Sequence, residues 1–111
     1  MEIAEQQAGE ITIVEIKGRI DSNTAKLFGE RLTSLIKAGR ARLLVDLKQL
    51  IYISSAGFRA LLVAGKLAEE TNGTLALCNL SAEVQRLFDL GGFTDLFMTY
   101  ASREEGLTKL S

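Results

Sequence analysis

The order of apolar and polar positions divides the chain into short segments of strand and helix type. Residues 11–17 largely alternate between β-branched apolar and polar side chains, which predicts a β-strand that is broken at Gly18. A turn at Gly9 is expected to pair this strand with a shorter one near residues 2–6. The pattern therefore predicts a hairpin at the start of the chain.

Two longer helices are predicted from apolar residues that recur every three or four positions. The first follows residues 21–24, which are rich in N-cap residue types, and stops at Gly39. The second begins at Ser54 or Ser55 and ends near residues 72–73. The predicted inward side chains are Phe28, Leu32, Leu35 and Ile36 in the first helix, and Phe58, Leu61, Leu62, Gly65 and Glu69 on one side of the second.

Further strands and helices alternate along the rest of the chain. Residues 42–47 form a nearly continuous apolar run, typical of a central strand that is covered on both faces. Residues 74–79 and 95–100 predict two more strands. Between them, Ser81 is placed to cap a short helix that ends at Gly91-Gly92 and turns Val84, Leu87 and Phe88 inward.

The capping box Ser102-Arg103-Glu104-Glu105 opens a last helix that carries Leu107 and Leu110. The order of elements is then β(β)αβαβαβα. It predicts one α/β domain over residues 1–111, with a mostly parallel mixed sheet of four or five strands. Right-handed crossovers should pack the helices over this sheet.

Composition changes this picture by excluding whole classes of function. Basic and acidic residues number 13 and 14, so no basic stripe is available for nucleic acid. No apolar run approaches the ~20 residues that cross a bilayer. The acidic start Met1-Glu2-Ile3-Ala4-Glu5 is unlike a signal peptide. We therefore expect a cytoplasmic protein without direct membrane insertion.

Missing residue types argue against catalytic and metal chemistry. The chain has no histidine and one cysteine, which removes the usual general base and the common zinc sites. Cys78 lies in an apolar run and is interpreted as a core residue. Asp46 is interpreted as a turn residue at a strand end, and Gly91-Gly92 lacks the lysine and hydroxyl of a phosphate-binding loop. We expect no enzyme activity, no metal and no cofactor.

The junction Ser54-Ser55-Ala56-Gly57 lies between a strand and a helix. Its simplest interpretation is a serine N-cap, which stabilises a helix by about 1 kcal/mol. The alternatives are an anion site or a phosphorylated serine, because the N-terminus of a helix favours negative charge. If the strands are parallel, this loop and the loop at residues 18–24 share one edge of the sheet and form one surface.

Three motifs occur in order over essentially the whole chain: Gly18-Arg19-Ile20-Asp21, Leu47-Lys48-Gln49-Leu50-Ile51-Tyr52-Ile53-Ser54-Ser55-Ala56-Gly57 and Leu80-Ser81-Ala82-Glu83-Val84-Gln85-Arg86-Leu87-Phe88. Each alone is unspecific, but together they strongly resemble the STAS domains of the anti-sigma-factor antagonist family. The resemblance implies a STAS-like fold and a switch that works by serine phosphorylation.

The resemblance also assigns the modified residue. In the family an aspartate, a serine, a serine or threonine and a glycine open the second helix, and the serine after the aspartate is phosphorylated. Aligned on Gly57, Ser55 takes the phosphoacceptor position. Ser54 stands where the aspartate would be, and Ala56 replaces the second hydroxyl. Ser55 is the expected site and Ser54 the second choice.

The implied partners follow from the same resemblance. The unmodified domain would bind an anti-sigma factor with serine-kinase activity, phosphorylation by that kinase would end the binding, and a serine phosphatase would restore it. This chain would be substrate and ligand. Phe58 is expected in the core, and the expected partner contacts are Asp21, Ser22, Asn23, Thr24, Ser54, Ala56, Gly57 and Arg59.

Two other classes of function remain open at this stage. A similar domain can dock permanently in a transporter or a sensory assembly, with a serine that is never modified, and the departure at Ser54 leaves room for this. An α/β layout can also hold a nucleotide, although no phosphate-cradling loop or catalytic base is visible in the sequence.

Overall fold

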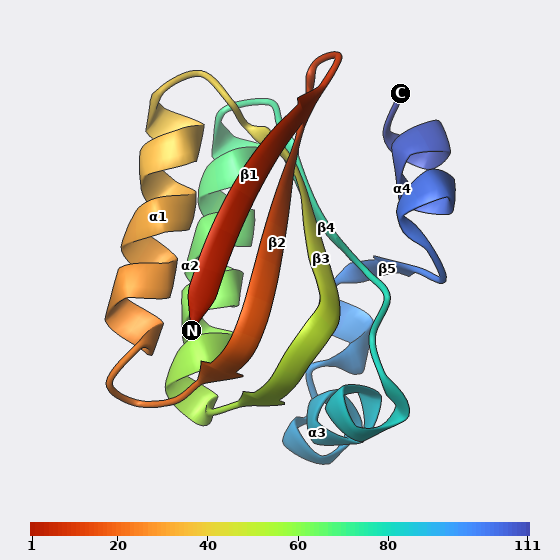
Figure 1. The fold of residues 1–111 in the computed structure, drawn as a ribbon. Coiled ribbons are helices and arrows are strands. Elements are labelled where there is room, and N and C mark those ends of the chain that lie inside the picture. The colour runs from red at the N-terminus through yellow and green to blue at the C-terminus, as the bar shows by residue number, and fades with distance from the viewer.

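The computed structural model describes all residues, Met1–Ser111, as a mixed sheet with helices on both faces (Figure 1). The five strands follow one another across the sheet in chain order. The first pair is antiparallel and the other pairs are parallel, which confirms the predicted α/β class and the N-terminal hairpin. The strands are β1 (Glu2–Ala8), β2 (Ile11–Ile20), β3 (Arg42–Ile53), β4 (Thr74–Cys78) and β5 (Met98–Tyr100).

Helices α1 (Ala25–Lys37), α2 (Ser55–Glu70) and α3 (Ala82–Gly91) pack on one face of the sheet, and α4 (Arg103–Leu110) packs on the other. Successive side chains of a strand point to opposite faces, and β3 and β4 use both. The large core under the first three helices contains Leu43, Val45, Leu47, Leu75 and Leu77, whereas Leu44, Ala76 and Cys78 pack with Leu110 of α4. The predicted central strand covered on both faces is confirmed.

Two strands are longer than the sequence pattern predicts. β2 does not end at Gly18 but passes through it, with a φ angle of +99° there, and β3 continues past Leu47 to Ile53. The pairing of β2 with β3 shifts register twice, between Glu15 and Lys17 and again between Gly18 and Arg19. A bulge breaks the two-residue alternation of side chains, so the pattern of a strand is lost although the strand continues.

The last strand is shorter than predicted. Residues Thr94–Leu96 form a 3₁₀ turn, so only Met98–Tyr100 join the sheet. The other boundaries agree with the sequence signals. The Ser81 and Ser102 hydroxyls accept hydrogen bonds from the third following N–H group, at 3.2 and 3.1 Å, and Gly92 ends α3 in the left-handed conformation.

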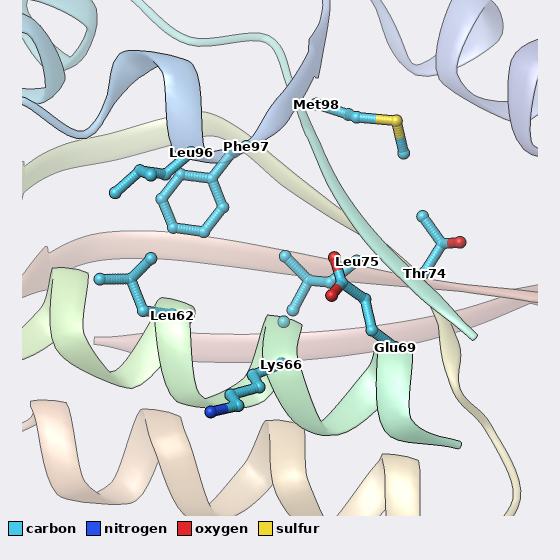
Figure 2. A pocket seen from close by; sticks show the side chains of 9 residues that line it. Leu62, Lys66, Glu69, Thr74, Leu75, Leu96, Phe97 and Met98 are labelled. Carbon is cyan, nitrogen blue, oxygen red and sulfur yellow. The ribbon is translucent and has the colours of Figure 1, made fainter. Parts of the chain in front are cut away.

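The buried side of α2 differs from the predicted one. Leu61, Ala64 and Ala68 are fully buried, whereas Leu62, Gly65 and Glu69 line a pocket of about 430 Å³ (Figure 2). The opposite wall of this pocket comes from β4, the 3₁₀ turn and β5. The two alanines allow the helix to lie close to its neighbours, and as small residues they contribute little to an apolar periodicity.

No helix combines the length with the hydropathy that a membrane-spanning helix requires.

The thiol of Cys78 is predicted to be inert in the folded protein. Its burial, and then the negative charge of Asp46, raise its pKa from 9.0 to about 12, so almost no thiolate is present near pH 8. A disulfide reagent should therefore label the native protein far more slowly than the denatured one. The Cys78 thiol ionises at lower pH in the unfolded chain than in the folded protein. Its ionisation should therefore lower the free energy of unfolding as the pH rises from about 9 towards 12, and not below that range. Rapid labelling of the native protein at pH 8 would contradict this.

Candidate functional site

The two loops that the sequence singles out meet at one edge of the sheet. Ile20 and Ile53 end the parallel strands β2 and β3 as direct neighbours, and the Ser54 N–H donates to the Ile20 carbonyl at 2.8 Å. Helices α1 and α2 therefore begin side by side at this edge, where α3 begins as well (Figure 1). The expectation that both loops share an edge is confirmed.

The loop before α1 is held by Asp21. Its carboxylate accepts hydrogen bonds from the N–H groups of Asn23 and Thr24 at 2.9 and 3.0 Å, and the Thr24 hydroxyl accepts from the Asp21 N–H at 2.9 Å. Because the Thr24 and Asn23 N–H groups stabilise the charged form, the pKa of Asp21 lies below its ordinary value. Asp21 thus closes the turn into α1, and Ser22 and Asn23 are exposed on its outside.

The two serines at the start of α2 have different surroundings. Ser54 is the N-cap residue, with extended backbone angles, and its hydroxyl accepts a hydrogen bond from the Gly57 N–H at 3.2 Å. Ser55 is the first residue of the helix and is exposed. Its hydroxyl takes part in no hydrogen bond within the chain. The capping function and a hydroxyl that is free to react are therefore divided between neighbouring residues.

The electrostatics of this helix start favour an added anion. The first turn of α2 contains no acidic residue, so nothing balances the partial positive charge of its free N–H groups. Arg59 follows Ser55 by four residues, which places both on the same face of the helix, and its side chain is exposed. A negative group on Ser55 would therefore be tolerated by the helix.

Gly57 and Phe58 fix how α2 sits on the strand ends. Phe58 is 4% exposed, as predicted, and its ring stacks on Phe93 with a centroid distance of 4.4 Å. Gly57 is buried, and a Cβ atom there would lie 2.7 Å from the Ile53 side chain and 2.8 Å from the Ile20 side chain. Of the expected contact residues, Gly57 alone lies below the surface, and its role is to let the helix approach the sheet.

A groove of about 430 Å³ runs from this edge between α1 and α2. Ser22, Ala56 and Arg59 lie at its start, so three of the expected contact residues line this groove. Ala25, Gly29 and Ala60 are among its other lining residues. Small side chains on both helices make the groove shallow and open to a partner.

A pair of alanine variants separates the two serines. Ser54→Ala removes the N-cap hydrogen bond and should lower the free energy of unfolding by about 1 kcal/mol. Ser55→Ala removes an exposed group without partners and should change it by less than about 0.5 kcal/mol. Urea unfolding of both variants measures the difference. Equal losses, or a larger loss for Ser55→Ala, would show that the cap is misassigned.

A second pair of variants tests the close approach at Gly57. Gly57→Ala forces a methyl group against Ile53 and Ile20 and should lower stability by about 1–2 kcal/mol, after the gain in helix propensity. Gly65→Ala is the matched control, because no atom beyond its chain neighbours and the nearby backbone of its own helix lies within 4 Å of the new Cβ. The control should be neutral or stabilising by up to about 1 kcal/mol. Thermal unfolding of the two proteins decides the point, and a stable Gly57→Ala would refute it.

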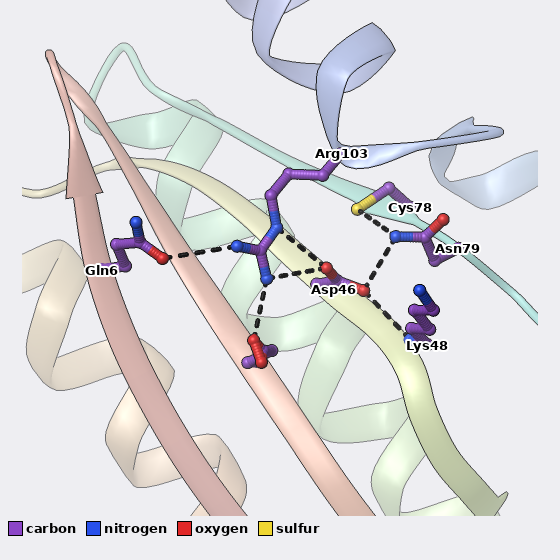
Figure 3. Close-up of polar contacts among 7 residues, drawn as sticks. Gln6, Asp46, Lys48, Cys78, Asn79 and Arg103 are labelled. Carbon is purple, nitrogen blue, oxygen red and sulfur yellow. Dashed lines mark hydrogen bonds and ion pairs between the residues drawn. The ribbon is translucent and has the colours of Figure 1, made fainter.

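A polar network on the opposite face was not predicted. Asp46 is not a turn residue but a buried residue in the middle of β3, and its carboxylate accepts from Arg103 at 2.9 and 3.0 Å (Figure 3). The same carboxylate accepts from Asn79 at 3.1 Å and from the Lys48 N–H at 3.0 Å. Arg103 also reaches Glu15 at 2.8 Å. Every acceptor position of Asp46 is thus occupied, which makes the network a structural clamp for α4.

The sheet, the helix order and the paired loops at one edge define a small α/β domain that presents a serine at a helix N-terminus. The chain belongs to the STAS-domain family, because the STAS domain model matches residues 2–106. The anti-sigma-B factor antagonist of Bacillus subtilis is 35% identical over 94 residues, which cover 85% of each chain. BtrV of Bordetella bronchiseptica, provisionally named an anti-sigma factor antagonist, is 35% identical over 89 residues, 80% of this chain and 77% of BtrV.

Solved structures share the fold at lower identity. A Thermotoga maritima protein superimposes with a TM-score of 0.90 at 16% identity, over 97% of this chain and 93% of the other. The phosphorylated form of the Bacillus cell fate determinant SpoIIAA has a TM-score of 0.75 at 18% identity, over 99% of this chain and 100% of the other. At these identities the likeness shows the fold alone.

Proposed function

We propose that this protein is an anti-sigma factor antagonist that is switched by phosphorylation of Ser55. The unmodified form binds an anti-sigma factor with serine-kinase activity, and the phosphorylated form does not. The observation that carries the proposal is that the two serines at the start of α2 have different roles. Ser54 is committed to the cap, whereas Ser55 is exposed with a hydroxyl that nothing engages.

The relatives support this choice of function. Two proteins at 35% identity carry names of anti-sigma factor antagonists, and a protein of the same fold has been solved in a phosphorylated form. The proposed contact surface consists of exposed or half-buried residues on two loops that meet: Asp21, Ser22, Asn23, Thr24, Ser54, Ala56 and Arg59.

The chemistry of the switch follows from where the phosphate is added. Phosphoserine carries about −1.5 to −2 charges and three acceptor oxygens. At Ser55 these oxygens lie next to the free N–H groups of α2, so the domain keeps its fold. A partner that places carboxylates or an apolar patch against this residue loses that contact. The modification therefore changes binding without changing structure, and a serine phosphatase reverses it.

Mapping the phosphate tests the proposal. The protein is incubated with ATP and each purified anti-sigma factor of the same genome that carries a serine-kinase domain, and the modified residue is located by mass spectrometry. We expect one phosphate on Ser55, its loss in Ser55→Ala and its retention in Ser54→Ala. The proposal would be overturned if the phosphate were found on Ser54, or if none of the kinases phosphorylated either serine. If the protein instead stayed bound to a membrane permease and neither serine was phosphorylated, a role as a permanent subunit of a transporter would be favoured.

A further inference from the structure

The arginines of the chain fall into two groups. Four are held by the chain itself: Arg31, Arg42 and Arg103 form ion pairs with carboxylates, and Arg40 donates to the Gln7 side chain. Arg19, Arg59 and Arg86 form no ion pair. All three are exposed, and they lie at the end of β2, in the second turn of α2 and in α3. The unpaired guanidinium groups thus gather around the edge that carries Ser55.

An exposed isoleucine lies among these arginines. Gly18 pairs with Leu50 and Arg19 with Tyr52, so Ile51 is the extra residue of a β-bulge. Ile51 is 60% exposed, whereas Leu50 just before it and Ile53 two residues after it are 3% and 1% exposed. One large apolar side chain is therefore exposed at the bulge, only three residues before Ser54.

Ile51 and two of the free arginines line the same hollow. Its volume is about 340 Å³, and its walls are Arg19, Ile51, Tyr52, Glu83, Arg86 and Leu87. The Arg19 guanidinium lies over the Tyr52 ring at 4.6 Å from the centroid, which holds it at the rim by a cation–π contact. Among the lining residues, two positive charges face one carboxylate, that of Glu83, so the lining has an excess of positive charge. The carboxylate of Asp21 also lies near Arg19, but it is bound by the Asn23 and Thr24 N–H groups.

We propose that this hollow is a second half of the docking surface, and that it receives a segment of the anti-sigma factor in which carboxylates flank an apolar side chain. The apolar side chain would cover Ile51, and the carboxylates would pair with Arg19 and Arg86. Charge complementarity and the exposed isoleucine are the two observations that carry the inference. It rests on the proposed function, because it names the chemistry of that same partner.

An acidic partner segment would also be sensitive to phosphorylation of Ser55. A phosphate on Ser55 lies one turn from Arg59 and adds negative charge to an edge that would otherwise attract an acidic partner. It lowers the positive potential of the surface and repels the approaching carboxylates. The same partner chemistry thus accounts for binding and for its loss.

Two substitutions at exposed positions test the inference, with the anti-sigma factor that modifies Ser55 as the probe. Ile51→Ser should lower the affinity about tenfold, as expected for an apolar residue at the centre of a contact. Arg86→Glu should slow association about tenfold at low salt, with a smaller effect at about 0.5 M salt. The matched controls are Leu90→Ser, at a residue 75% exposed, and Arg42→Glu, at the far end of β3. Both should bind like the wild type.

The outcomes separate the inference from the proposed function. If Ser55→Asp loses binding but Ile51→Ser and Arg86→Glu bind normally, the hollow is not a contact and the proposed function stands. If Arg86→Glu binds more tightly, the partner is not acidic there and the inference is wrong. If none of the anti-sigma factors binds the unmodified protein, both fail.

Discussion

Replacing Ser55 with aspartate is expected to weaken binding to the anti-sigma factor by at least ~1.4 kcal/mol, a factor of ten. Aspartate adds one negative charge at an exposed position in the middle of the proposed surface. The same charge lies at the first position of α2, where the helix has no acidic residue of its own. It should therefore leave stability unchanged or raise it by about 0.3–1 kcal/mol. Loss of binding with an intact fold is the expected signature.

Ser54→Asp is the matched control for this substitution. It adds the same charge one residue earlier, at a position where aspartate caps a helix as well as serine does. Its carboxylate would accept the Gly57 N–H in a half-buried position, whereas an aspartate at Ser55 would be exposed, so Ser54→Asp should weaken binding less than Ser55→Asp. Titration calorimetry and thermal unfolding of both variants provide the measurement. If Ser54→Asp and Ser55→Asp weaken binding equally, charge at the edge matters but Ser55 is not special.

The second large effect is expected on stability. Arg103→Met should lower the free energy of unfolding by about 2–3 kcal/mol, because it leaves the Asp46 carboxylate charged and without its cation in a buried position. The Asp46 side chain is 4% exposed and that of Arg103 30%. Since water reaches Arg103, and Asp46 keeps its bonds to Asn79 and Lys48, the loss stays below the ~3–5 kcal/mol of a fully buried pair.

The control and the rescue for this variant come from the same chain. Arg42→Met breaks an ion pair with Glu10 whose side chains are 42% and 87% exposed, and should cost less than about 1 kcal/mol. Adding Asp46→Asn to Arg103→Met removes the unpaired charge but keeps the acceptor for Lys48, and should recover part of the loss. Chemical unfolding of the three proteins gives the comparison. No rescue would mean that packing of α4, rather than charge, sets the cost.

Local signals predicted most of the fold. Cap serines, glycine stops and apolar spacing placed the elements, because each acts within one turn of helix or one strand. The ends of β2 and β3 were predicted too early, because bulges interrupt the alternation of side chains at Gly18 and between Leu47 and Ile53. On α2, the buried residues Ala64 and Ala68 are small and weakly hydrophobic, whereas Leu62 is strongly hydrophobic. The predicted buried face of α2 was therefore rotated towards the pocket beside β5.

Long-range pairing could not be predicted from spacing. Asp46 and Arg103 are 57 residues apart, and nothing near either residue indicates the other. From local pattern alone, Asp46 was therefore interpreted as a turn residue and Arg103 only as part of a capping box. The edge that brings Asp21 and Ser55 together was predicted, because parallel strands with right-handed crossovers leave no other arrangement. The exposure of Ile51 was not predicted either, because Ile51 is itself the extra residue of the bulge that hid the end of β3.

The role of Ser54 is the point where structure adds most to the sequence. From the sequence, Ser54 and Ser55 were both candidates for modification, and the missing aspartate weakened the choice. In the structure the Ser54 hydroxyl accepts the Gly57 N–H, which is the bond that an aspartate at an N-cap would make. Ser54 thus fills the capping part of the missing residue without its charge. Of these two serines, Ser55 is thus the one whose hydroxyl is free.

The most direct test of the account compares three preparations of one protein against one anti-sigma factor. They are the unmodified chain, the chain phosphorylated to completion on Ser55, and the same sample after treatment with a serine phosphatase. We expect the phosphorylated sample to bind at least ten times more weakly and the phosphatase to restore the original affinity. Equal affinities of the phosphorylated and unmodified samples would contradict the proposed switch.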